Sequence, residues 1–366
     1  MHKLIAAGAF TLGLVAFGWS LAAADGDPVA WSPRAAAAYL DQRTSWWMGW
    51  TNAQRDHETF CVSCHTATPY ALARPALRRA LGESGPSAIE ARLIDNVTKR
   101  VRMWKDVEPF YPDQTRGIPK TSESRGTEAI LNALILAARD AGTRTLSDDA
   151  RKAFDNLWAL QFKAGELSGA WAWLNFHYEP WEAERSGFYG ATLAAVAVGV
   201  APDGYATTPA IQDRLKALRE YLRKGSETAH LFNRVNLLWA SGVWPELLTR
   251  EQQQSIIDAV RRSQRDDGGW SVASFAEWKR IDGTPLDSRS DGYATGLVAF
   301  ALQSAGVPRT DPQVRRALDW LAAHQDAAAG HWFTSSLNKQ RDPASDAGKF
   351  MTDAATAYAA LALSFP

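Results

Sequence analysis

Apolar residues recur at helical spacing in several segments of the chain, and a helix-start signal precedes most of these segments. Three stripes are Ile89–Leu93–Val97–Val101, Ile211–Leu215–Leu218–Leu222 and Val314–Leu318–Leu321. A capping residue followed by proline occurs at Ser32-Pro33, Thr208-Pro209 and Asp311-Pro312. Such a residue caps the free N–H groups of a helix start, and proline suits the first helical position. The pattern predicts amphipathic helices with one solvated face.

Other segments are small and apolar nearly all round. They include TEAILNALILAARDAG, YGATLAAVAVGV, YATGLVAFALQSAG and DAATAYAALALS. A helix of this kind is buried on every side. The two kinds alternate with a period of roughly 50 residues, which is typical of a repeat architecture.

Six helix pairs account for the alternation. The pairs are 33–50 with 66–82, 87–106 with 124–141, 147–162 with 187–200, 208–224 with 228–241, 249–264 with 291–305, and 311–325 with 351–364. An open solenoid of pairs is one possible arrangement. The second helices are too apolar to line a concave face in water, so we expect a closed ring: a single all-α (α/α)6 toroid with inner apolar and outer amphipathic helices.

Three predicted outer helices end in glutamine, a glycine-bearing loop and tryptophan: Gln161 to Trp171, Gln264 to Trp270, and Gln325 to Trp332. This pattern resembles the Gln–Trp repeat of squalene–hopene cyclases and the related α/α-toroid proteins, which include protein prenyltransferase β-subunits. The resemblance implies the toroid, with each glutamine capping an outer helix and stacking on its tryptophan.

The chemistry of those families does not transfer. No Asp-x-Asp-Asp tetrad is present, and Asp148-Asp149 and Asp266-Asp267 are isolated pairs. The zinc site of the prenyltransferases needs a late cysteine, but no cysteine follows position 64.

Residues 1–24 have the features of a secretory signal peptide. Lys3 precedes an apolar run, and Ala22-Ala23-Ala24 offers a cleavage site. We therefore expect a toroid domain over 25–366 that is periplasmic or secreted, with an uncleaved anchor as the alternative. After cleavage, 40 basic and 40 acidic residues become 39 and 40, a net charge of −1. That balance argues against a nucleic-acid partner.

Cys61, Cys64 and His65 form a Cys-x-x-Cys-His motif with the only two cysteines of the chain. This spacing is typical of covalent haem c attachment, in which two thiols meet the porphyrin vinyl groups and the histidine binds iron. The alternatives are a Cys61–Cys64 disulfide, a zinc site lacking a second ligand pair, and a redox dithiol lacking a βαβ context. The export signal favours haem c.

The starts of the inner helices should meet at one mouth of the barrel, with the motif among them. Four residues there are candidate catalytic groups: Arg125, Glu128, Asp291 and Tyr293. Each is also a plausible helix cap or solvated polar residue. For the sixth iron ligand the candidates are Met351, because repeat six would lie beside repeat one, and His230 across the mouth.

Two functional interpretations follow. The first is an exported haem-c electron carrier or oxidoreductase, with a periplasmic redox partner and an apolar, isoprenoid-like substrate. The alternative is a terpenoid-cyclase-like or glycan-active barrel enzyme with a Cys61–Cys64 disulfide and no haem, in which Glu128 and Asp291 serve as acid and base.

Overall fold

The computed structural model describes residues 31–113 and 119–366, which contain twelve α-helices of two kinds. The outer helices are α1 (Pro33–Gly49), α3 (Ala88–Arg102), α5 (Asp148–Leu160), α7 (Gln212–Ser226), α9 (Arg250–Arg262) and α11 (Pro312–Ala323). The inner helices are α2 (Ala67–Leu81), α4 (Lys120–Thr143), α6 (Ser186–Val200), α8 (Leu231–Val243), α10 (Gly292–Ser304) and α12 (Phe350–Leu363). The predicted signal peptide lies outside the described residues.

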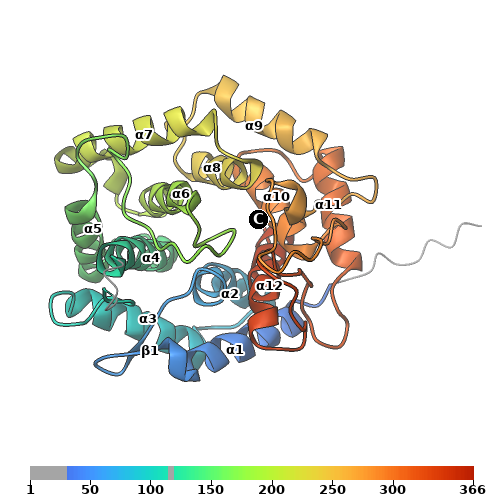
Figure 1. Cartoon of the computed structure of the whole chain (residues 1–366), viewed down its shortest axis with the longest axis horizontal. Helices are drawn as coiled ribbons and strands as arrows, with labels where there is room; N and C mark the ends of the chain where they lie inside the picture. Colours follow the sequence, from blue (N-terminus) through green and yellow to red (C-terminus); the bar gives the residue numbers. More distant parts are fainter. Residues whose placement is uncertain (1–30, 114–118) are drawn as a thin grey trace, which may run out of the picture. The chain divides into compact units, whose positions relative to one another are not determined.

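The inner helices form a ring, and the outer helices surround it (Figure 1). Each inner helix packs against the next, and α12 packs against both α2 and α1. The prediction of a closed all-α toroid is confirmed, and the open solenoid is excluded. Among the described helices, none combines the length and the apolar character needed to cross a membrane.

Short elements join the helices. The strands β1 (Gln54–Arg55) and β2 (Thr59–Phe60) form an antiparallel hairpin directly before Cys61. The 3-10 helices are η1 (Thr51–Ala53), η2 (Tyr205–Thr207), η3 (Pro209–Ile211), η4 (Val272–Ser274) and η5 (Ala347–Lys349). The proline at position 209 therefore opens a 3-10 turn rather than the outer helix itself, and α7 begins three residues later at Gln212.

Glycines let the inner helices approach one another closely. A Cβ atom on Gly242 in α8 would overlap the backbone carbonyl of Ser304 at the end of α10. A Cβ atom on Gly296 in α10 would lie 2.5 Å from the backbone nitrogen of Ala359 in α12. Backbone contact of this kind explains why these helices are rich in small residues.

The glutamines of the Gln–Trp repeat tie neighbouring repeats together. The Nε2 amide of Gln161 donates to Gly169 O in its own loop at 3.0 Å and to Arg214 O in α7 at 3.1 Å. Gln264 does the same with Gly268 O and Gln313 O. The three tryptophans, Trp171, Trp270 and Trp332, each donate the indole N–H to a carbonyl near the end of the preceding outer helix.

The third glutamine closes the ring. Gln325, which follows α11, accepts the N–H of Ser32 at 2.6 Å and donates to Ser32 O at 3.0 Å and to Gly330 O at 2.9 Å. Ser32 is the N-cap of α1, so the last repeat is bonded to the first. Gly330 has a φ of 77°, and a Cβ there would overlap the carbonyl of Ala35 in α1. Only glycine suits that position.

We expect Gln325→Ala to lower the free energy of unfolding by about 1–3 kcal/mol, because three hydrogen bonds are lost, two of them across the closure. The measurement is chemical denaturation followed by circular dichroism. Gln254→Ala is the matched control, since Gln254 is exposed and bonds only to Asp258 within α9. Equal midpoints for the two variants would contradict the closure role.

Candidate functional site at the mouth of the barrel

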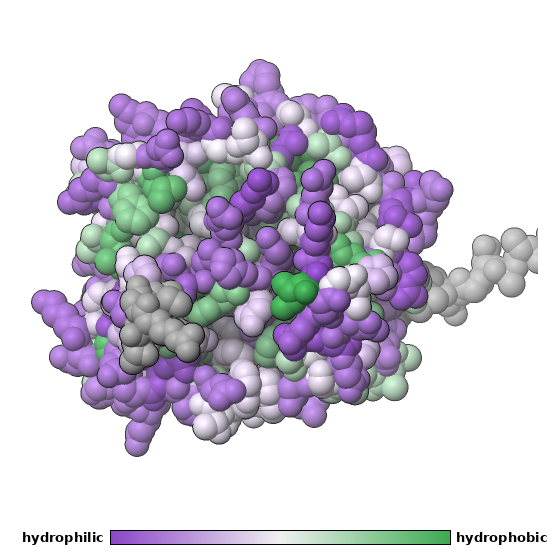
Figure 2. Space-filling model, viewed as in Figure 1, coloured by the Kyte–Doolittle hydropathy of each residue, from purple (hydrophilic) through white to green (hydrophobic). Residues whose placement is uncertain are grey.

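Three long loops, each running from an outer helix to the next inner helix, meet at one end of the barrel. They span residues 161–185, 263–291 and 324–346, and the first extends toward the barrel axis (Figure 1). The large hydrophobic side chains that are exposed in the described ranges all lie on these loops: Leu167, Tyr178, Ile281 and Phe333. Figure 2 shows hydrophobic atoms among polar ones on this face. Exposed apolar groups concentrated in this way mark a site of interaction.

Asn338 joins the three loops. Its side-chain oxygen accepts the N–H of Glu179 at 2.7 Å, and its Nδ2 donates to Glu179 O at 2.8 Å. Its backbone carbonyl accepts the N–H of Ile281 at 2.8 Å. We call these three hydrogen bonds the Asn338 clasp. The clasp holds a tight turn in which Tyr178 and Glu182 exchange backbone hydrogen bonds.

The carboxyl group of Glu182, in that turn, has no partner among the described residues. Within the described residues no side-chain hydrogen bond or ion pair reaches it, and Lys120 acts on it only at longer range. Protein surrounds the side chain, yet part of its surface stays accessible, as for a group that lines a recess. Burial raises the pKa of Glu182 to about 7. The carboxyl is therefore about half protonated at neutral pH.

His65 lies beside the same turn. Its ring is stacked on Phe350 with the centroids 3.9 Å apart, and the Trp181 ring is 6.0 Å away. We call the region around these residues and Glu182, which follows Trp181 in sequence, the central recess.

A hydrogen-bond chain sets the tautomer of His65. The Thr66 hydroxyl donates to Asp353 at 2.7 Å, so Nδ1 of His65, 2.8 Å from that hydroxyl, is the donor of the pair. Asp353 also accepts from Tyr39 and Arg43. Burial, and then the charge of Arg43, lowers the pKa of His65 to about 3, so Nε2 carries a free lone pair at neutral pH.

Cys61 and Cys64, which precede His65 in the sequence, are free thiols and form no disulfide with each other. Cys61 is 5% exposed and Cys64 is 2% exposed, and both belong to the hydrophobic core. Burial raises the pKa of Cys61 to about 12 and raises that of Cys64 well above its ordinary value, and the charge of Glu182 adds to both effects. These thiols are neutral and poorly reactive.

The motif as packed does not fit a haem. The free Nε2 of His65 is a suitable iron ligand, but a porphyrin attached to both thiols needs open space beside two sulfur atoms. Here the thiols are enclosed, and the rings of Trp47, Trp181 and Phe350 lie against His65. Nothing below depends on haem.

The predicted sixth ligands lie elsewhere. Phe350, not Met351, contacts His65, and Met351 is buried in the first turn of α12. His230 is the N-cap of α8, where Nδ1 accepts the N–H of Asn233, and its ring packs against Trp278. Burial lowers the pKa of His230 to about 4.

Among the predicted catalytic residues, Glu128 and Arg125 are engaged in ion pairs. The carboxylate of Glu128 is fully buried and accepts from Arg100 at 2.6 and 3.1 Å, with Arg125 3.5 Å away. Burial raises the pKa of Glu128, and the two arginines oppose the rise. The cluster links α3 to α4.

Asp291 and Tyr293 lie at the start of α10. Asp291 is the N-cap and accepts the N–H groups of Ala294 and Val272 at 2.9 and 2.6 Å. Burial raises its pKa to about 6. The fully buried Tyr293 accepts the indole N–H of Trp181 at 2.9 Å, so this residue borders the wall of the central recess.

A pocket of about 960 Å³ adjoins the recess, between the 161–185 loop and the ends of α7 and α8. Ala183 and Glu184, next to Glu182 in sequence, line it together with His230. Its aromatic residues are Phe162, Trp171, Trp173, Phe188 and Tyr221. Its acidic residues are Glu123, Glu166, Glu184 and Glu227. Aromatic rings beside polar groups are typical of a ligand site.

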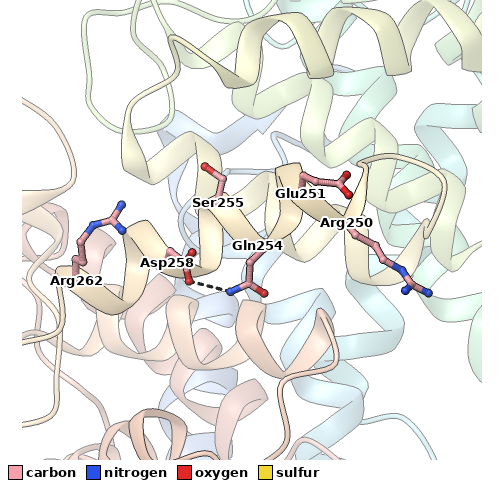
Figure 3. Close-up of a pocket in the computed structure, with 6 residues that line it drawn as sticks. All are labelled: Arg250, Glu251, Gln254, Ser255, Asp258 and Arg262. Atoms are coloured by element: carbon pink, nitrogen blue, oxygen red, sulfur yellow. Dashed lines mark hydrogen bonds between the residues drawn. The ribbon is translucent and has the colours of Figure 1, made fainter.

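A second hollow lies far from the mouth. Arg250, Glu251, Gln254, Ser255, Asp258 and Arg262 line it (Figure 3). All six belong to α9, and Gln254 bonds to Asp258 one turn away. This is the solvated face of an outer helix, and no buried polar group points into it. Residues on this exposed face of α9 are therefore suitable for control substitutions.

Comparisons with known proteins identify similar folds only. No family model matches the chain, and no curated protein matches it. Two solved structures of a glycosidase, one of them the wild type, are 14% identical over 90% of this chain and 97% of theirs, with a TM-score of 0.45. A polysaccharide lyase is 10% identical over 92% of this chain and 89% of its own, with a TM-score of 0.37.

The interpretation as a haem-carrying electron-transfer protein is corrected. Across residues 31–113 and 119–366, no three His, Cys, Asp or Glu side chains gather closely enough to hold a metal ion.

We expect Asn338→Ala to increase the rate at which a thiol reagent labels Cys61 and Cys64 by roughly tenfold, because loss of the clasp favours local opening of the loops. The measurement is a labelling time course on reduced protein. Asn52→Ala, at an exposed position before β1, serves as the control. Unchanged labelling in Asn338→Ala would show that the clasp does not limit access.

Proposed function

We propose that the protein is a glycan-active enzyme that binds a saccharide at the mouth of the barrel and uses Glu182 as its general acid. The observation that carries the proposal is the carboxyl of Glu182, which no other side chain in the described part of the chain pairs with and whose pKa of about 7 leaves it partly protonated at neutral pH. A proton donor tuned in this way suits cleavage of a glycosidic bond. The structural carboxylates Glu128 and Asp291 are committed to ion pairing and helix capping.

The adjoining pocket of about 960 Å³ suits the substrate class. Sugar rings present apolar faces that pack on aromatic side chains, while their hydroxyls bond to carboxylates and amides. Trp173 holds its ring in place by donating its indole N–H to Trp181 O at 2.7 Å. Two acidic residues of the pocket lining, Glu184 and Glu123, are the candidates for the second carboxylate, and Glu123 also accepts the N–H of Asn175 and pairs with Lys120.

In the proposed hydrolysis, Glu182 gives its proton to the glycosidic oxygen as the bond from the anomeric carbon to that oxygen breaks. Water then adds its oxygen to the anomeric carbon. The second carboxylate takes a proton from that water, and Glu182 is reprotonated from solvent. The balance is one water consumed per bond cleaved.

We expect Glu182→Gln to lower kcat on a cleaved glycan by 10²- to 10⁴-fold, the usual contribution of a positioned acid. In the wild type, activity should fall as the pH rises above about 7, because the protonated fraction declines. The measurement is release of reducing ends from a panel of polysaccharides. Glu251→Gln on the outer face of α9 is the control (Figure 3). Full activity of Glu182→Gln would exclude Glu182 as the acid.

The raised pKa of Glu182 should also make the stability of the protein depend on pH. Glutamate titrates near 4.5 when unfolded and Glu182 near 7 when folded. Wild-type stability should therefore decline as the pH rises through this window, and Glu182→Gln should lack that decline.

A second candidate function is binding of an apolar small molecule, and a pocket of about 300 Å³ at the opposite end of the barrel favours it. Side chains from all six inner helices line the pocket, and most are apolar. They include Leu72, Leu134, Val196, Trp239, Phe300 and Leu361. A dry, non-polar space of this size accommodates a short alkyl or isoprenoid chain.

We expect Ala138→Phe to fill this pocket and weaken binding of a fluorescent fatty-acyl probe at least tenfold. The measurement is the emission of the probe during titration. The matched control is Ala141→Phe, which lies in the same helix but is exposed. Equal affinities would place the probe outside the pocket.

A further inference from the structure

Two adjoining pockets lie between the 263–291 and 324–346 loops, next to the mouth. Their volumes are about 350 and 400 Å³, and both are lined by Asp287, Arg289, Phe333 and Ser335. Neither pocket is lined by residues of the Glu182 turn. We call the two neighbouring pockets together the arginine groove.

Positive charge exceeds negative charge in the larger of the two pockets. Its charged lining residues are Arg280, Arg289, Arg341 and Asp287. Arg289 donates two hydrogen bonds to Asp287, at 2.7 and 3.1 Å, so the charges of these two side chains cancel. Arg280 donates to the carbonyl oxygens of Ser336 and Pro285, which fix its guanidinium without removing its charge. The larger pocket therefore has a net charge of about +2, whereas the smaller pocket, lined by Arg265, Arg289, Asp267, Asp287 and Asp291, has a net charge of about −1.

Phe333 presents an aromatic ring in the same groove. Its side chain is 42% exposed although the backbone beside it is held firmly. Its carbonyl accepts the N–H of Gly292 at the start of α10, and Thr334 next to it donates to Asp291 at 3.1 Å. An exposed aromatic ring on a rigid backbone can stack on a ligand with only a small loss of conformational entropy.

We propose that the arginine groove is a subsite for an acidic sugar residue, with the ring of the sugar on Phe333 and its carboxylate or sulfate on Arg341 and Arg280. This inference rests on the proposed function and deepens it, because it makes the substrate an anionic polysaccharide. Guanidinium groups bind carboxylate and sulfate through paired, charge-assisted hydrogen bonds. Asn338 connects the groove to the Glu182 turn, since it belongs to the same loop as Phe333 and Arg341.

The test is isothermal calorimetry of the full chain with an oligogalacturonide and with the neutral galacto-oligosaccharide of equal length. We expect the acidic ligand to bind at least tenfold more tightly, with an affinity that falls as salt is raised. Arg341→Ala should weaken acidic binding by 5- to 50-fold and leave neutral binding unchanged. Phe333→Ala should weaken both. Arg250→Ala, on the outer face of α9, should change neither (Figure 3).

The outcomes separate this inference from the proposed function. Equal affinity for acidic and neutral ligands, no binding of either, or unchanged acidic binding in Arg341→Ala would each overturn the acidic subsite. If the acidic ligand binds but no glycan is cleaved, the proposed enzyme activity fails and the subsite stands.

Discussion

The constraint on which the structure depends is that six helices must be kept from water on all sides. Four of the inner helices, α4, α6, α10 and α12, have small apolar residues around nearly their whole circumference, so an open edge would expose a hydrophobic face. Closure through Gln325 and Ser32 removes that edge, and the close approach at Gly330 leaves no room for a side chain. The amphipathic outer helices then separate the ring from solvent.

Closure also determines where chemistry can occur. Because each long loop leads to the start of an inner helix, the loops gather at one mouth, and the Asn338 clasp ties them together. Glu182 and His65 are shielded from water in this region, and the burial raises the pKa of Glu182 and lowers that of His65. The acidic and basic properties of the site arise from this burial rather than from an unusual residue.

The Cys-x-x-Cys-His motif illustrates the limit of local patterns. Its spacing suits two thioether bonds to a porphyrin, but the thiols form part of the core and aromatic rings surround His65. What decides between haem attachment and core packing is the space beside the sulfur atoms. Residues far away in sequence, Trp181 and Phe350, pack on the ring of His65.

The sequence by itself determined the helices, their pairing and the Gln–Trp ties, because these follow from periodicity, capping and short-range spacing. It also indicated that Asp291, Tyr293 and His230 lie near one mouth. Only the tertiary structure decided that Glu128 is held in an ion-pair cluster, that Asp291 and His230 serve as helix caps, and that Glu182 is buried with no side-chain partner in residues 31–113 and 119–366. No local pattern marks Glu182, since its property comes from neighbours brought together by the loops. Desolvation and pairing depend on such long-range contacts, and a linear pattern does not record them.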